Sequence, residues 1–226
     1  MCGRFIQYAA GERLAARFDL PAAPGLTPRY NVAPSQLVGA IRIAEGGSRE
    51  WVALRWGLIP AWAAEPRTEY STMNARAETV ADKPTYRQAF RRRRCLIPAD
   101  GFYEWRKLGA RKQPYCIAPA DGEPVAFAGL WERWERDGRT LESCAIVVTQ
   151  ANALVAPIHD RMPVILDPAV EARWLDPRVI DPVALRPLLV PCPPERLRLW
   201  PVGTAVNRPG AEGPDLMAPI ALQGLQ

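Results

Sequence analysis

A cysteine in second position is the residue of this sequence best placed to do chemistry. If Met1 is removed, Cys2 carries a free α-amine and a thiol on one carbon skeleton. Their reference pKa values are roughly 7.7 to 8.0 and about 8.5, so both groups are partly reactive near neutral pH. We therefore expect Cys2 to act as a double nucleophile toward a carbonyl carbon.

Glu104 lies in the segment GFYEWR, where aromatic residues surround a single carboxyl group. Alternation along a strand would put Phe102 and Glu104 on one side, with Tyr103 and Trp105 on the other. Removal from water raises the pKa of a carboxyl group toward neutrality, as a general acid or base requires. The alternative is an edge-strand glutamate paired with Arg106.

Two further polar residues stand in unusual surroundings. His159 is the only histidine and lies between apolar segments in VAPIHDRMPVIL. It is either a packed, hydrogen-bonded residue or a proton-transfer group. Asn74, in YSTMNARAET, is either a turn former or an amide that holds a substrate.

An arginine follows each of these four residues by two positions: Arg4, Arg76, Arg106 and Arg161. In an extended chain, such neighbours lie on the same side, roughly 6.5 Å apart. A reactive group and a phosphate-binding guanidinium could then share one face. The net charge of +5, carried largely by arginine, fits either a polyanionic partner or an ordinary solvated surface. We favour Arg4, Arg76 and Arg161, because Arg106 lies beside other basic residues.

The sequence pattern predicts many short strands with helices around them, and these elements must position the groups described above. We expect one α+β domain over residues 1–226, with a curved, largely antiparallel, barrel-like β-sheet core and peripheral helices. The strand-rich runs are 37–43, 49–59, 94–106, 114–134 and 140–149. The helical segments are 11–20, 81–93, 168–176 and 181–189.

Composition narrows the kind of protein. Five widely spaced cysteines and one histidine argue against a zinc site or a disulfide framework, so no metal or other cofactor is expected. The longest apolar runs are far shorter than the roughly 20 residues that cross a bilayer. We expect a cytoplasmic monomer with no membrane partner.

Six motifs then follow one another as in one known family: MCGRF, RYNVAPSQ, LRWGLIPAWA, MNARAET, CLIPADGFYEW and IHDRMPVIL. The sequence thus resembles the SOS response-associated peptidase (SRAP) family from Cys2 to about VGTAVNRPG. The resemblance implies a DNA-damage protein that crosslinks itself to abasic sites in single-stranded DNA, associating with the nucleoid when bound. Its catalytic residues match Cys2, Asn74, Glu104 and His159.

The resemblance also implies how DNA is held. Arg4, Arg76 and Arg161 would bind flanking phosphates, and Pro34 and Trp62 would wedge against stacked bases. Some relatives carry a second aromatic residue where Ala63 stands here. Junctions between single- and double-stranded DNA are a further expected target. The run Arg91 to Arg94 is either a patch that follows the DNA backbone or a solvated helix end.

The implied reaction joins the Cys2 amine and thiol to the aldehyde of an opened abasic sugar as a thiazolidine, with removal of Met1 as the peptidase step and a lyase activity as a further expectation. The rival interpretation is an N-terminal-nucleophile hydrolase of the class II glutamine amidotransferase type. Such enzymes also begin with a cysteine after Met1. They require a two-layer sheet sandwich and usually a partner synthase domain, for which 226 residues leave little room.

Overall fold

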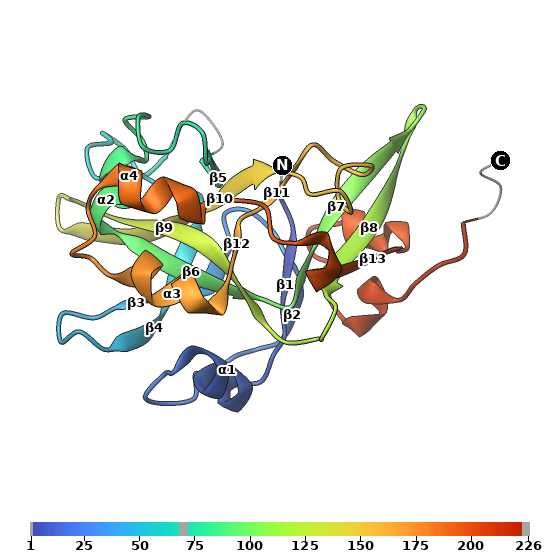
Figure 1. Cartoon of the computed structure of the whole chain (residues 1–226), viewed down its shortest axis with the longest axis horizontal. Helices are drawn as coiled ribbons and strands as arrows, with labels where there is room; N and C mark the ends of the chain where they lie inside the picture. The colour runs from blue at the N-terminus through green and yellow to red at the C-terminus, as the bar shows by residue number, and fades with distance from the viewer. Residues whose placement is uncertain (1, 68–71, 223–226) are drawn as a thin grey trace.

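The computed structural model describes residues 2–67 and 72–222. Strands β3, β4, β6, β9 and β10 close into a small barrel (Figure 1). Neighbouring strands pair in the order β4, β3, β6, β9, β10, and β10 pairs back with β4. Their bounds are β3 Leu37–Ile43, β4 Arg49–Trp56, β6 Arg94–Ala99, β9 Val125–Arg136 and β10 Arg139–Gln150. Three short strands extend this sheet: β5 Asn74–Arg76, β11 Arg161–Pro163 and β12 Ile165–Leu166.

A second, five-stranded antiparallel sheet lies against the barrel, in the order β13-β8-β7-β1-β2. Its strands are β1 Phe5–Gln7, β2 Arg29–Val32, β7 Gly101–Leu108, β8 Arg111–Pro119 and β13 Leu197–Pro201. The chain passes from β6 of the barrel into β7 through Asp100 alone. The β7–β8 hairpin projects beyond the body of the molecule (Figure 1). The expected α+β fold with a curved, largely antiparallel core is confirmed; β10 pairs in parallel with β4 and β5.

Short helices cover the outside of the sheets. Helix α1 (Gly11–Phe18) buries Leu14 and Phe18, which lie on one face four residues apart. The remaining α-helices are α2 Arg87–Arg92, α3 Pro168–Leu175 and α4 Pro182–Leu185. Asp167 and Asp181 cap α3 and α4, and each is followed by a proline at the first helical position.

The helix expected over 81–93 begins only at Arg87, so its first half is wrong. Residues 77–86 form turns instead. Pro84 has no N–H to donate and biases the residue before it away from helical geometry. The sequences Ala-Asp-Gly at 120–122 and Asp-Gly at 137–138 are typical of turns and form turns here, with Gly122, Asp137 and Gly138 all at positive φ.

The core extends to the N-terminal segment. Phe5 and Phe102 each pack edge-on against Phe127, and Phe5 also packs against Trp56. Cys2 belongs to the same cluster and is fully buried. In the part of the chain that the structure describes, no helix is long and apolar enough to cross a membrane.

Candidate active site

Cys2 is positioned by strand β1, which begins three residues later. Phe5 pairs with Phe102 of β7, and the amide of Tyr103 donates to the carbonyl of Arg4, 3.0 Å away. This antiparallel pairing brings the residues before Arg4 alongside Glu104. Burial raises the pKa of the Cys2 thiol well above its ordinary value, and the nearby charge of Glu104 raises it further. The thiol is therefore protonated at neutral pH.

Asn74 holds the Cys2 backbone. Its Nδ2 donates to the Cys2 carbonyl oxygen at 2.8 Å. Strand β5 places it there by pairing in parallel with β10, with Asn74 opposite Ile146, and the Tyr86 hydroxyl donates to the Asn74 carbonyl. The buried Oδ1 of Asn74 has no hydrogen-bond partner among the described residues. That oxygen is free to accept a hydrogen bond from an added group.

Glu104 is 2% exposed on β7, on the side of the strand that Phe102 also faces. Burial raises its carboxyl pKa from 4.5 to about 7. The expected strand and burial are confirmed, and no ion pair with Arg106 is present among the described residues. At neutral pH, Glu104 exists in both protonation states, so it can give or take a proton.

His159 lies in the loop between β10 and β11. Asn152 fixes this loop, because its Oδ1 accepts from the amides of Leu154 and Val155 while its Nδ2 donates to the Cys192 carbonyl. The His159 side chain is partly buried, and burial lowers its pKa, which favours the neutral imidazole.

Two groups compete for Nδ1 of His159. The Arg161 amide lies 3.0 Å away and donates to it, and an Asp160 carboxylate oxygen lies at 2.8 Å. A neutral Nδ1 that accepts from Arg161 cannot also donate to Asp160. The neutral ring therefore carries its hydrogen on Nε2, and protonation would instead favour the contact with Asp160.

A pocket of about 430 Å³ lies at two of these groups. Glu104 and His159 line it together with Trp105, Lys107, Lys112 and Asn207. The Trp105 indole donates to Asn207 Oδ1 at 2.8 Å, which ties the C-terminal segment to β7. The structure thus places the four residues expected to be catalytic near one another: Asn74 donates a hydrogen bond to Cys2, the charge of Glu104 raises the pKa of the Cys2 thiol, and His159 lines the same pocket as Glu104.

The three arginines differ in what they contact. Arg4 donates to Asn31 Oδ1 and to the Val206 carbonyl, both at 2.8 Å, so its guanidinium already holds the C-terminal segment. Arg161 forms an ion pair with Glu78. Arg76 is exposed and makes no side-chain hydrogen bond or ion pair with a described residue.

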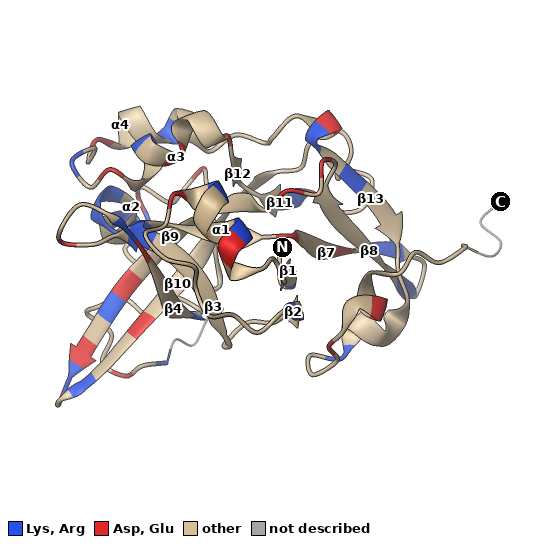
Figure 2. Ribbon diagram, turned by 90° about the horizontal axis from the view of Figure 1, so that it is seen from below, with Lys and Arg blue, Asp and Glu red and all other residues tan. Residues whose placement is uncertain are grey.

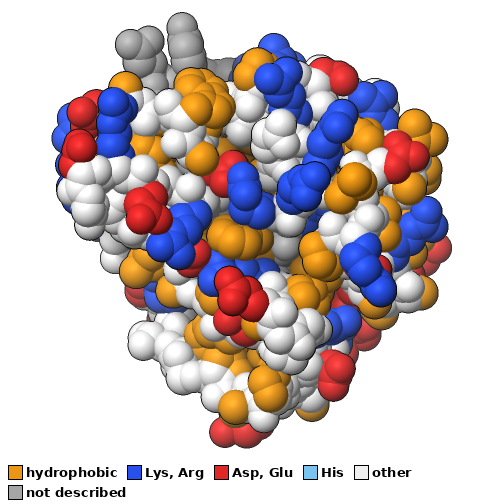
Figure 3. Space-filling view, turned by 90° about the vertical axis from the view of Figure 1, so that its left-hand side faces the viewer, with side chains coloured by type: hydrophobic (Ala, Val, Ile, Leu, Met, Phe, Trp, Pro, Cys, Tyr) orange, Lys and Arg blue, Asp and Glu red, His pale blue; other side chains and the backbone are white. Residues whose placement is uncertain are grey.

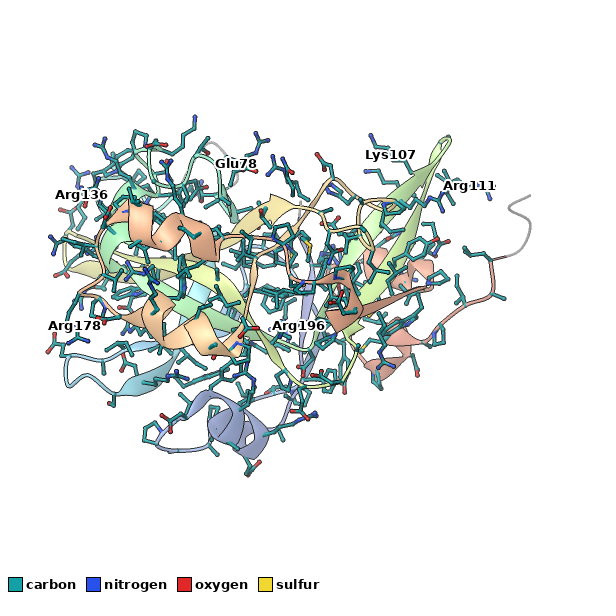
Figure 4. The ribbon with its side chains drawn as sticks, viewed as in Figure 1. Glu78, Lys107, Arg111, Arg136, Arg178 and Arg196 are labelled. Carbon is teal, nitrogen blue, oxygen red and sulfur yellow. The ribbon has the colours of Figure 1, made fainter. Side chains whose placement is uncertain are left out.

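Arg76 and Arg161 nevertheless lie close in the sheet, because Val148 and Gln150 of β10 pair with them from β5 and β11. Glu78, the ion-pair partner of Arg161, marks the position of that arginine. Figure 4 shows Glu78 on the same upper side of the molecule as Lys107 and Arg111. One face could thus offer several cations to a strand of phosphates.

Pro34 and Trp62 lie in neighbouring loops at one end of the β3–β4 pair. Trp62 is 69% exposed, and neither residue lines the pocket of Glu104 and His159. Their proposed contact with bases stays a prediction.

The run Arg91 to Arg94 fits neither simple interpretation. Arg94 is buried and donates to four backbone carbonyls, including those of Trp174 and Asp176, and Arg93 pairs with Glu132. Arg91 and Arg92 are exposed. On the face turned toward the viewer in Figure 3, basic side chains are scattered among acidic and apolar ones rather than gathered in one patch.

Some residues that shape the site were missed from the sequence. Asn152 sets the His159 loop, and its signal is an Asn followed by turn-forming residues. Asn31 and Asn207 bind Arg4 and Trp105 across long stretches of chain, which local pattern cannot reveal. Among the described residues, no group of three or more His, Cys, Asp or Glu side chains could hold a metal ion.

The site thus places a buried cysteine next to the N-terminus near an amide, a carboxyl group of raised pKa and an imidazole. The family model described as "SOS response associated peptidase (SRAP)" matches residues 1–209, and the chain belongs to this family. The abasic site processing protein YoqW of Bacillus subtilis (strain 168) is 41% identical over 223 residues, covering 96% of this chain and 99% of that protein.

Two further proteins are similar to this chain over nearly its whole length. The abasic site processing protein YedK of Escherichia coli (strain K12) is 31% identical over 228 residues, covering 97% of this chain and all of that protein. The crystal structure of a protein from Bacteroides thetaiotaomicron superposes with a TM-score of 0.87 at 28% identity, covering 97% of this chain and 100% of that one. The closed barrel formed by β3, β4, β6, β9 and β10 departs from the two-layer sandwich that an N-terminal-nucleophile hydrolase requires.

Proposed function

We propose that the protein processes abasic sites in single-stranded DNA by forming a covalent crosslink through Cys2. The names of its relatives supply the lesion, and the hydrogen bond from Asn74 to the carbonyl of a buried Cys2 is the observation that carries the mechanism. An abasic deoxyribose in its open form presents an aldehyde. A 1,2-aminothiol is the one group here that can trap an aldehyde twice.

The raised thiol pKa orders the steps. Because the Cys2 thiol stays protonated, the α-amine adds first to the aldehyde carbon and gives a carbinolamine. Loss of the hydroxyl as water gives a Schiff base. The sulfur then adds to the imine carbon while its proton passes to the nitrogen, which closes a five-membered thiazolidine. One water molecule leaves overall.

Proton transfer falls to the groups beside Cys2. With a pKa of about 7, Glu104 can protonate the departing hydroxyl and then accept a proton again. Neutral His159 can orient or deprotonate a reacting group, and Asn74 Oδ1 can accept from the amine. Arg76 and Arg161 would bind flanking phosphates, and Pro34 and Trp62 would contact bases. Arg4 would contribute chiefly by fixing the segment behind Cys2.

The mechanism requires that Met1 be removed, because only then does Cys2 have a free amine. Met1 lies outside the described residues, so its removal is part of the proposal. This cleavage is the one peptidase step that the mechanism requires. The Schiff base is also the intermediate from which a lyase reaction would start, so strand cleavage would compete with closure of the thiazolidine ring.

Intact-mass analysis tests the proposal most directly. After incubation with single-stranded DNA that holds one abasic site, the expected adduct has the mass of the protein without Met1, plus the oligonucleotide, minus one water. Undamaged DNA and DNA in which the sugar aldehyde has been reduced are controls that should give no adduct. An adduct that retains Met1, or no adduct with any abasic DNA, would overturn the proposal. Glutamine hydrolysis without DNA would favour the hydrolase interpretation instead.

A further inference from the structure

The β7–β8 hairpin carries an unbalanced set of positive charges. Arg106, Lys107, Arg111 and Lys112 lie between residues 105 and 119, and that stretch has no acidic residue. The β9–β10 hairpin differs, because its basic positions alternate with acidic ones such as Glu132, Glu135 and Glu142 (Figure 2). A general excess of arginine in this protein therefore does not explain the β7–β8 hairpin.

Two of the three lysines in the whole chain face each other on this hairpin. The register pairs Lys107 directly with Lys112. Opposite residues in an antiparallel pair have Cβ atoms about 4.5 to 5.5 Å apart on one face, and like charges in that position destabilise the pair. Both side chains are exposed, and neither has a hydrogen bond or ion pair with a described residue. An anion between them would remove the repulsion.

Protection of an open strand edge explains this arrangement less well. β7 has no β-partner beyond Tyr103 on the side of β1 among the described residues, and lysines often guard such edges. One lysine on β7 would serve that purpose. A second lysine on the inner neighbour, at the same register and on the same face, adds repulsion without guarding the edge.

The lysine pair lies at the pocket of Glu104 and His159, which both lysines line. The hairpin is also held at its base. Gln113 Nε2 donates to the Val202 carbonyl at 2.9 Å, and Trp105 is bonded to Asn207. Lys107 and Arg111 project from it on the side seen in Figure 4. These bonds fix the base of the hairpin whose strands carry Lys107 and Lys112.

We propose that Lys107 and Lys112 together bind one backbone phosphate of the DNA strand, next to the nucleotide whose sugar lies in the Glu104–His159 pocket. This inference rests on the proposed function and adds a phosphate site to it. The hairpin serves as an arm that holds the strand from the side opposite to β5 and β11, where Arg76 and Arg161 lie. Two ammonium groups on one phosphate form charge-assisted hydrogen bonds, which are stronger than neutral ones.

The test measures binding of undamaged single-stranded DNA at several salt concentrations, so that no crosslink is involved. The double variant Lys107→Gln/Lys112→Gln should lower the salt slope by about 0.7, the value for one phosphate bound on a single strand. Each single variant should lower it by less, because the second lysine remains. Arg173→Gln is the matched control: this exposed arginine, which has no ion pair with a described residue, lies on α3, away from the hairpin, and its replacement should leave the slope unchanged.

Thermal unfolding gives a second readout. Because the like charges repel in the free protein, Lys107→Gln and Lys112→Gln should each leave the melting temperature unchanged or raise it, whereas removal of a stabilising interaction would lower it. A double variant with the slope of the native protein would overturn the lysine site. Failure of the proposed function looks different: the native protein would form no adduct with abasic DNA, whatever its salt slope.

Discussion

The side-chain amide of Asn74 donates a 2.8 Å hydrogen bond to the backbone carbonyl of Cys2. This bond ties a strand of the barrel to the segment that carries the nucleophile. It acts on the backbone and leaves the thiol and amine available. Asn74 therefore fixes the backbone of Cys2 at its carbonyl group, and in the proposed reaction its unpartnered Oδ1 would accept a hydrogen bond from the amine.

Asn74→Ala should slow crosslinking by roughly ten- to a hundredfold, because removing a hydrogen bond that positions a reactive group costs about 1 to 3 kcal/mol. Single-turnover rates with abasic DNA measure the effect. Ser143→Ala is the control, since Ser143 is a buried polar side chain of β10 that accepts from a backbone group, the amide of Ile59, and is not part of β1. Equal slowing in both variants would mean that Asn74 acts only through stability.

Cys2→Ala should abolish the heat-stable adduct with abasic DNA, because the sulfur that closes the ring is gone. Cys2→Ser should give at most a labile adduct, since an oxazolidine reopens more readily than a thiazolidine. Gel shifts after heating distinguish these outcomes. Cys144→Ala is the control, because this cysteine is equally buried but lies in the barrel wall. Efficient stable crosslinking by either Cys2 variant would show that another residue is the nucleophile.

Much of the fold follows from local pattern. Residues 37–43 and 140–149 alternate or run apolar as strands do, and the turn signals at 120–122 and 137–138 lie where the structure places turns. The shortest strands could not be predicted this way. β5 and β11 have three residues each and exist because β10 offers them a paired edge, which is a tertiary effect.

The candidate site could likewise be predicted from the sequence only in part. Glu104 could be found from its aromatic neighbours, because burial of a carboxyl is visible in a strand pattern. The full burial of Cys2 could not be predicted, since it depends on how β1 pairs with β7. The hydrogen bonds from Arg4 to Asn31 and Val206 could not be predicted either. They make this arginine a structural anchor as well as a candidate phosphate ligand.

Arg76→Ala and Arg161→Ala should each weaken binding to single-stranded DNA of any sequence. The salt slope should fall by about 0.7 for each phosphate that is no longer bound. Arg161 also pairs with Glu78, so Glu78→Gln is its control: this variant removes the ion pair, keeps the guanidinium, and should bind DNA at least as tightly as the native protein. Unchanged salt slopes in both arginine variants would show that these side chains are solvated surface residues that bind no phosphate.

Glu104 should make stability depend on pH. Its pKa rises from 4.5 in the unfolded chain to about 7 in the folded protein, so the folded state binds more protons between these values. Its contribution is fully present below a pH of about 4.5 and declines as pH rises through about 7, by up to roughly 3 kcal/mol. Denaturant unfolding at about pH 5 and about pH 8 should show this decline, and Glu104→Gln should lack it. Equal pH dependence in both proteins would contradict the raised pKa.

The same substitution should separate chemistry from binding. Glu104→Gln keeps the shape of the side chain and removes its titrating proton, so crosslink formation should slow by about 10²- to 10⁴-fold while DNA affinity stays nearly unchanged. The native rate should also change near a pH of about 7, where Glu104 titrates, and the variant should not show that change. Rates of the bound fraction across roughly pH 5 to 9, measured beside equilibrium binding, provide the comparison. If the variant bound DNA much more weakly but its bound fraction crosslinked at the normal rate, Glu104 would have a structural role. Proton transfer would then fall to His159.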